Sequence, residues 1–180
     1  MDALLIASVR AVERIVGTIG RSTSLVLPLI VVVIVVNVVA RYGFGLGLIE
    51  LEELQWHLNA LVVMGCLAYA YRDNAHVRVD IIHSALSQRG KAIIEIMGGL
   101  VLLLPFVLGI AWFAWHSFAY SFSIAERSPM PSGLPARYVV KFIVFAGFAL
   151  LAIQGLAVIV RAGFALRGRR IPPAGPDAPA

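Results

Sequence analysis

The run ELEELQWHLNALVVMGCLAYAYRDNAHVRVDII, residues 50–82, is acidic at its start, apolar through its middle and basic past its end. As a helix, residues 51–71 would be roughly 30 Å long at 1.5 Å per residue, which matches the hydrocarbon thickness of a bilayer. The first turns carry polar side chains that are costly in lipid unless polar groups face them. The run therefore predicts a membrane-spanning helix that packs against protein on more than one side.

The polar side chains of this predicted helix fall into two stripes. At about 100° per residue, Glu52, Gln55 and Asn59 share one face, while Glu53 and His57 lie nearly opposite. We expect the first stripe to face a partner protein and the second to face the chain's own helices.

The composition is that of an all-α membrane protein. Of 180 residues, 60% are hydrophobic and 14% are charged, with a mean hydropathy of +0.89. Soluble domains usually carry about 25% charged residues. The net charge of +5 does not indicate nucleic-acid binding, because the basic residues lie between apolar spans and not in one stripe. The single cysteine, Cys66, allows no disulfide within the chain.

The apolar runs predict four transmembrane helices in one domain covering residues 1–180, at roughly residues 22–41, 51–71, 92–116 and 137–161. A helix is expected even for the β-branched run 31–36, because in lipid a helix satisfies its own backbone. Pro28 is expected to kink the first span, and Asn37 near its outer end needs a partner. Gln154 in the last span is expected to be an amide buried within the bundle.

The segments outside the spans have their own patterns. Residues 1–20 predict an amphipathic helix lying on the membrane surface, with Glu13 among its polar residues. A signal peptide is disfavoured, because Asp2 stands where a basic segment belongs and Glu13 interrupts the apolar run. A short surface helix is expected after Asp80, and the tail 171–180 is expected to be disordered.

Lysine and arginine counts predict the orientation. With both termini in the cytoplasm, the inner segments hold eleven Lys and Arg residues and the outer segments hold four. This bias predicts cytoplasmic N- and C-termini and a cytoplasmic loop at residues 72–91.

Histidines offer one alternative function. His57 and His116 are expected near the outer membrane face on neighbouring spans, where they could ligate a haem in a four-helix cytochrome. The simpler interpretation pairs His57 with Glu53 one turn earlier, places His116 among the aromatic residues Trp112 and Trp115 at the interface, and expects no cofactor. His76 and His83 lack further ligands for a metal site. The sequence holds no catalytic signature, so an enzyme is not expected.

Several pieces in order resemble one family. Glu52-Glu53 open the second span, Gly65 follows, and residues 71–80 read YRDNAHVRVD; later come Glu126, Ser128, residues 133–137 (GLPAR) and Gln154-Gly155. Over roughly residues 20–165 the chain resembles the small, DctQ-like permease subunit of tripartite ATP-independent periplasmic (TRAP) transporters. The closest resemblance is to the branch associated with mannitol, chloroaromatic and 2-oxo acid uptake.

The resemblance implies a multi-pass subunit of the bacterial inner membrane that scaffolds a larger membrane subunit. That larger subunit would carry an organic acid together with sodium, and a periplasmic binding protein would deliver the substrate. Partner-interface candidates are Glu52, Gln55, Asn59, Arg72, His76 and Asp80. Glu53, His57 and Gln154 are expected to act within the bundle.

Overall fold

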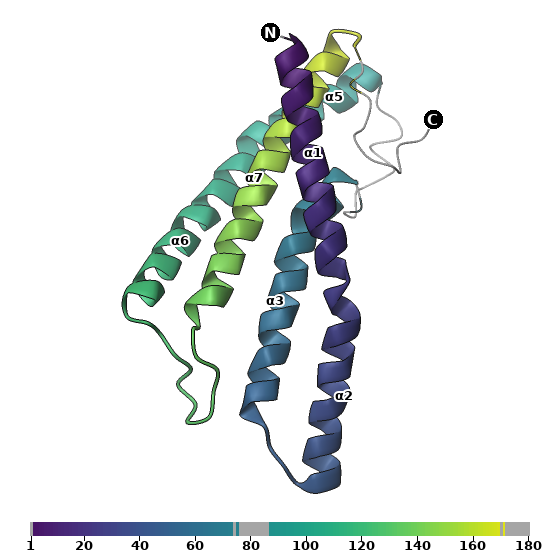
Figure 1. Cartoon of the computed structure of the whole chain (residues 1–180). Helices are drawn as coiled ribbons and strands as arrows, with labels where there is room; N and C mark the ends of the chain where they lie inside the picture. The colour runs from purple at the N-terminus through teal and green to yellow at the C-terminus, as the bar shows by residue number, and fades with distance from the viewer. Residues whose placement is uncertain (1, 74, 76–86, 170, 172–180) are drawn as a thin grey trace.

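The computed structural model describes residues 2–73, 75, 87–169 and 171, and all regular structure in that part of the chain is helical (Figure 1). The elements are α1 (Asp2–Ser24), α2 (Val26–Phe44), α3 (Ile49–Arg72), α5 (Gln88–Met97), the π-helical segment η1 (Gly98–Leu103), α6 (Leu104–Ser123) and α7 (Tyr138–Leu166). The prediction of an all-helical chain is confirmed for these residues.

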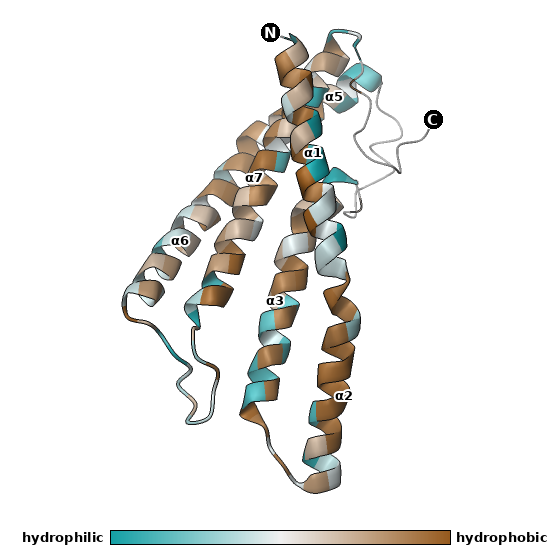
Figure 2. Ribbon diagram, in the orientation of Figure 1, coloured by the Kyte–Doolittle hydropathy of each residue, from teal (hydrophilic) through white to brown (hydrophobic). Residues whose placement is uncertain are grey.

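The helices form two hairpins, α2–α3 and α6–α7, which diverge from a common end where α1 and α5 lie (Figure 1). Among the described residues, three stretches are long and apolar enough to cross a membrane: Asp2–Phe44, Gln88–Ser123 and Tyr138–Leu166. α3, a predicted span, is not among them, because the polar residues of its first half lower its hydropathy (Figure 2).

Helices α1 and α2 follow one another with a break of one residue at Leu25. The break lies three residues before Pro28, whose missing N–H leaves the Ser24 carbonyl without its helical donor. α1 continues along the direction of α2 and packs on α3 and α7 (Figure 1). The expected helix is present and contacts α3 and α7, and its predicted place at the membrane surface stays a prediction.

Close approach between α1 and α3 depends on small residues. A Cβ at Gly20 would overlap the Tyr69 side chain, and one at Gly65 would lie 2.9 Å from the Cβ of Thr23. Deeper in the molecule, α1, α3, α6 and α7 meet in a core cluster consisting of Val16, Ala68, Leu104, Val107, Leu151 and Ala152.

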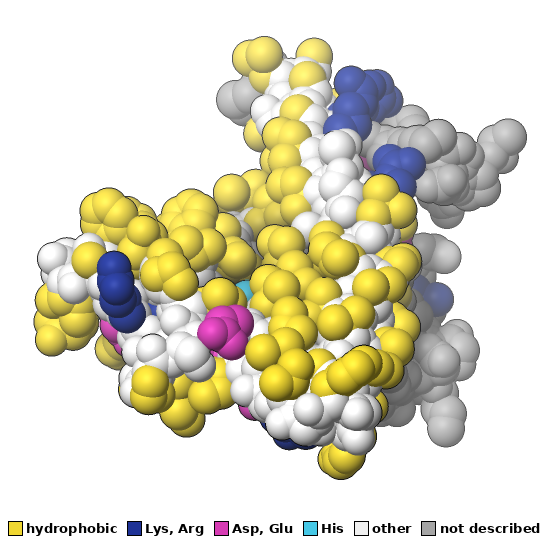
Figure 3. All heavy atoms as spheres, turned by 60° about the horizontal axis from the view of Figure 1, so that its bottom comes forward, with side chains coloured by type: hydrophobic (Ala, Val, Ile, Leu, Met, Phe, Trp, Pro, Cys, Tyr) yellow, Lys and Arg dark blue, Asp and Glu magenta, His cyan; other side chains and the backbone are white. Residues whose placement is uncertain are grey.

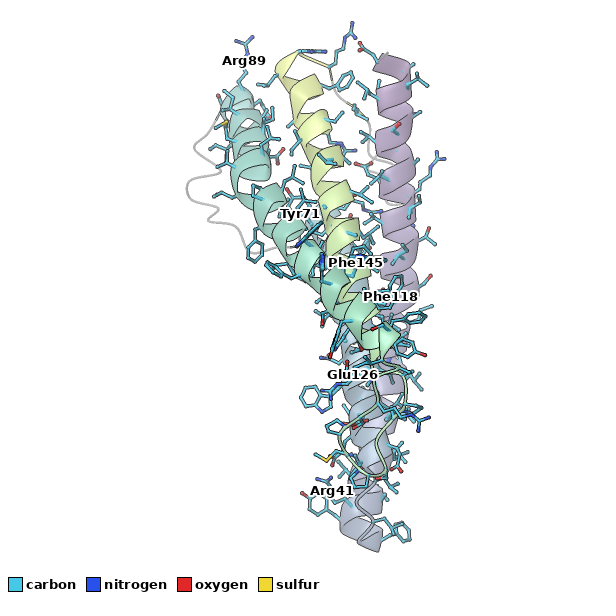
Figure 4. All side chains as sticks on the ribbon, turned by 90° about the vertical axis from the view of Figure 1, so that its left-hand side faces the viewer. Arg41, Tyr71, Arg89, Phe118, Glu126 and Phe145 are labelled. Atoms are coloured by element: carbon cyan, nitrogen blue, oxygen red, sulfur yellow. The ribbon has the colours of Figure 1, made fainter. Side chains whose placement is uncertain are left out.

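Aromatic side chains join α6 to α7. The Phe118 ring centroid lies 5.2 Å from that of Phe142, and the Trp115 centroid lies 5.0 Å from that of Phe145. Figure 4 shows Phe118 and Phe145 along the two facing helices. Trp115 therefore takes part in helix packing, whereas Trp112 is exposed as expected for an interfacial tryptophan.

The π-helical segment η1 precedes Pro105 in the third apolar stretch. Proline cannot donate to the carbonyl four residues earlier, and its ring crowds that carbonyl. Widening the preceding turn to the i→i+5 pattern relieves the crowding, so the helix continues through Pro105.

At the C-terminal end, Ile171 is buried against Val9, Ala157 and Phe164. The prediction of a disordered tail is therefore wrong for this residue. Residues 172–180 and the expected surface helix at 81–86 lie outside the described residues.

Candidate functional site

An ion pair ties α1 to α7 near the common end of the hairpins. Glu13 of α1 has 2% of its surface exposed, and its two carboxylate oxygens lie 2.9 and 3.1 Å from Nη2 of Arg161 on α7. The backbone carbonyl of Glu13 accepts a 2.9 Å hydrogen bond from Nη1 of Arg72, at the end of α3. We call these three residues the inner tie, because together they join three helices.

The local sequence makes room for the Arg72 guanidinium. A Cβ at Gly17 would overlap Nη1 of Arg72, so a side chain there would displace it. The guanidinium also stacks 4.8 Å from the Tyr69 ring centroid and donates to Asp73 over 2.6 Å. Arg72, a predicted partner-interface residue, is thus engaged within its own chain.

A second contact joins the hairpins at their far ends. The Glu53 carboxylate of α3 accepts hydrogen bonds from the Ser128 hydroxyl and, over 2.6 Å, from the Leu134 N–H. Ser128 also bonds to Leu134 through its own N–H, over 3.3 Å, so the loop presents both donors together. We call Glu53, Ser128 and Leu134 the outer tie.

The expected Glu53–His57 pairing takes a different form. Nδ1 of His57 donates to the backbone carbonyl of Glu53 over 2.7 Å, while the Glu53 carboxylate reaches the loop. His116 of α6 makes the same bond to the Trp112 carbonyl over 2.8 Å. α7 lies between α3 and α6, so the two histidines of the haem alternative stand on helices of different hairpins (Figure 1).

Two further ion pairs lie at this end. Glu52 pairs with Arg41 across the α2–α3 hairpin, and Glu126 Oε2 lies 2.5 Å from Nζ of Lys141. Figure 4 shows Arg41 at the end of the molecule opposite Arg89, and Glu126 in the half nearer to Arg41. The Lys141 ammonium holds the pKa of the Glu126 carboxyl below its ordinary value of 4.5.

This lowered pKa predicts a pH dependence. A carboxylate with a lower pKa in the folded state contributes stability above its unfolded pKa, and the contribution disappears as the pH falls through the folded value. Between pH 5 and pH 3 the wild-type chain should therefore lose more unfolding free energy than Glu126→Gln, measured by thermal unfolding in detergent. Equal losses would show that the Glu126–Lys141 pair contributes no pH-dependent stability.

A cleft of about 360 Å³ opens beside the outer tie. Glu52, Glu53, Trp56 and His57 line it from α3, and Arg137 lines it from the start of α7. Trp56 is 72% exposed. Figure 3 views the molecule from this end and shows acidic side chains among apolar ones between the two hairpins.

The remaining predicted site residues are dispersed. Asn59 is exposed, Gln55 has a buried amide nitrogen without a partner among the described residues, and Gln154 is fully buried with neither amide atom bonded within that part of the chain. His76 and Asp80 lie outside the described residues.

Sequence reasoning missed the Glu13–Arg161 pair and the loop donors to Glu53. Glu13 interrupts an apolar run in α1 and Arg161 ends one in α7, which is the available signal for a buried pair. Ser128 and Leu134 lie 75 and 81 residues from Glu53, so helix periodicity gives no indication of these contacts.

Comparisons with known proteins agree with the resemblance in the sequence. A family profile described as tripartite ATP-independent periplasmic transporters, DctQ component, matches residues 30–163. A Haemophilus influenzae protein provisionally named a TRAP transporter small permease protein is 29% identical over 143 residues, which are 79% of this chain and 86% of that protein. No solved structure matches the chain. The profile covers most of the chain, including both sides of the outer tie, and the chain therefore belongs to the DctQ family of TRAP transporter small permease components.

Proposed function

We propose that this small permease component scaffolds the large membrane subunit of a sodium-coupled, binding-protein-dependent transporter for organic acids in the bacterial inner membrane. Four spans, α2, α3, α5–α6 and α7, would cross the bilayer. The 24 residues of α3 extend about 36 Å, enough to span even though the helix is less apolar than the others. Its neighbours α2, α1 and α7 cover part of its surface.

The arrangement of charges supports a scaffold. The inner tie, the outer tie and the Arg41–Glu52 pair connect polar groups of the spans to other parts of the same chain. In contrast, α2 and α6 present long exposed apolar faces, including Val31, Val35, Phe106 and Phe113. Such faces suit contact with lipid or with another membrane protein.

The exposure of Asn59 is the observation on which the proposal mainly rests. It is exposed on α3, beside the exposed Val63 one turn later and about 10 Å along the helix from Glu52. An amide exposed to hydrocarbon is costly, so a polar group of a partner should face it. The large subunit of the transporter is the proposed partner.

Replacing Asn59 tests this contact. Asn59→Leu should reduce co-purification of the large subunit about threefold to thirtyfold, because an interhelical hydrogen bond in membranes contributes roughly 0.6–2 kcal/mol. The control is Ser117→Ala, at an exposed position of α6. In reconstituted vesicles, uptake normalised to assembled complex should keep its sodium dependence in both variants. A changed sodium dependence at normal assembly would place this subunit in the transport path and contradict the scaffold proposal.

The proposed orientation has its own test. Gln88→Cys and Ser132→Cys, each in a Cys66→Ser background, place one thiol at an exposed position at either end of the molecule. An impermeant thiol reagent added outside should label Ser132→Cys alone, because the charge bias puts α5 on the cytoplasmic side. Labelling of Gln88→Cys alone would show the opposite orientation.

A further inference from the structure

An apolar groove of about 490 Å³ lies between α3 and α7, within the range of roughly 300–1,000 Å³ that is usual for small-molecule sites. Leu61 and Gly65 line it from α3, Phe142, Ala146 and Ala149 from α7. The floor is closed, because the helices touch where a Cβ at Gly147 would lie 2.7 Å from the Cβ of Met64.

The groove continues the polar cleft beside the outer tie. His57 of the cleft and Leu61 of the groove are four residues apart on α3, and Val140 and Ile143 are three apart on α7. Residues at these spacings are neighbours on one helix face. The seam between the two hairpins is therefore polar at its outer end and apolar below.

The deep end of the seam is closed by α1. Ile19 and Thr23 line that end of the groove, and next to them α1 packs directly on Tyr69 of α3 at Gly20. A partner helix crossing the whole bilayer would collide with α1 there. An acyl chain entering from the outer leaflet ends near mid-membrane and meets no such obstacle.

The outer cleft supplies charges of both signs. Arg137 on one wall and the Trp56 indole N–H are donors for a phosphodiester, and Glu52 and Glu53 make the α3 wall negative. Glu52 is paired with Arg41, but the partners of Glu53 are the uncharged Ser128 hydroxyl and Leu134 N–H, so the Glu53 charge is not compensated and a purely anionic headgroup would meet repulsion that an ammonium group relieves.

We propose that the seam between α3 and α7 binds one zwitterionic, amine-bearing phospholipid, with an acyl chain in the groove and the headgroup in the cleft. The site depends on the proposed membrane placement of the chain but not on the scaffold role. Lipid occupancy and subunit assembly are measured separately, so either proposal can fail while the other stands.

Native mass spectrometry of the full, delipidated chain tests the site with added dioleoyl-phosphatidylethanolamine. One lipid per chain should bind saturably, several-fold more tightly than dioleoyl-phosphatidylglycerol or dioleoylglycerol. Ala149→Phe fills the groove and should abolish this binding, whereas Ala119→Phe, at an exposed position of α6, should not. Arg137→Gln should weaken binding about tenfold by removing a charge-assisted hydrogen bond, and Arg127→Gln in the same loop should leave it unchanged.

Three results would overturn the proposal: binding to Ala149→Phe at the wild-type level, equal binding of the phosphatidylglycerol, or unchanged lipid binding with loss of large-subunit co-purification in Ala149→Phe. The last result would assign the groove to a protein helix. If Ala149→Phe does not elute as a monodisperse species, Ala146→Leu adds a smaller group to the same wall and serves in its place.

Discussion

Glu13→Ala should lower the free energy of unfolding by about 3 kcal/mol, because it leaves the Arg161 guanidinium without its charged partner. Breaking a buried ion pair usually costs about 3–5 kcal/mol, and Arg161 is 29% exposed, which favours the lower end of that range. The measurement is thermal or denaturant unfolding of the purified chain in detergent. Arg14→Ala changes the exposed neighbour of Glu13 and should stay within about 0.5 kcal/mol of wild type.

The double variant Glu13→Leu with Arg161→Leu separates the charge from the packing. Replacing both members of a buried pair by apolar residues is often neutral, so the double variant should recover most of the loss. If the loss in the double variant equals the sum of the losses in the single variants Glu13→Leu and Arg161→Leu, the two side chains do not stabilise one another.

Glu53→Ala should lower the unfolding free energy, because two hydrogen bonds to a carboxylate are lost together. The Ser128 and Leu134 donors lose their acceptor together, so the α6–α7 loop should detach from α3. In a Cys66→Ser background, thiol labelling of Ser132→Cys should become several-fold faster.

Two variants control for this effect. Glu53→Gln keeps one carbonyl acceptor and should show a smaller change in both measurements. Glu50→Ala removes an exposed carboxylate less than one turn away and should change neither. Faster labelling in Glu50→Ala equal to that in Glu53→Ala would attribute the effect to the loss of negative charge at this end and not to the outer tie.

The helical class followed from composition and apolar spacing because a bilayer permits few other backbones. The position of α1 did not follow. Its amphipathic pattern suits a lipid surface and a protein surface equally, and the choice depends on Arg161, which lies 148 residues away in the chain. Helix periodicity reports neighbours within one helix, so Glu53 was paired with His57 while its carboxylate bonds to a distant loop.

For Glu52, the information that helix periodicity lacks lies close by in the sequence. Its stripe on α3 was expected to face a partner protein, yet Glu52 pairs with Arg41 of the same chain. The turn at residues 45–48 is short, with Gly45 in the left-handed region at φ 68°. A short turn makes α2 and α3 antiparallel neighbours, so residues at equal distances from it come together. The faces of α2 and α3, considered together with this short turn, would have predicted the Arg41–Glu52 pair.

The π-helical segment η1 has a consequence for how the length of this protein can change. One residue inserted into an α-helix produces such a segment, and one residue removed from 98–103 would return it to regular α turns. Val107 and Ala111 would remain buried on the same face of α6, because the wide turn absorbs the difference in register. A single-residue deletion here would therefore keep the buried face of α6 in place, whereas the same deletion in another helix would rotate part of that helix out of its packing, but the Pro105 ring would again crowd the turn before it.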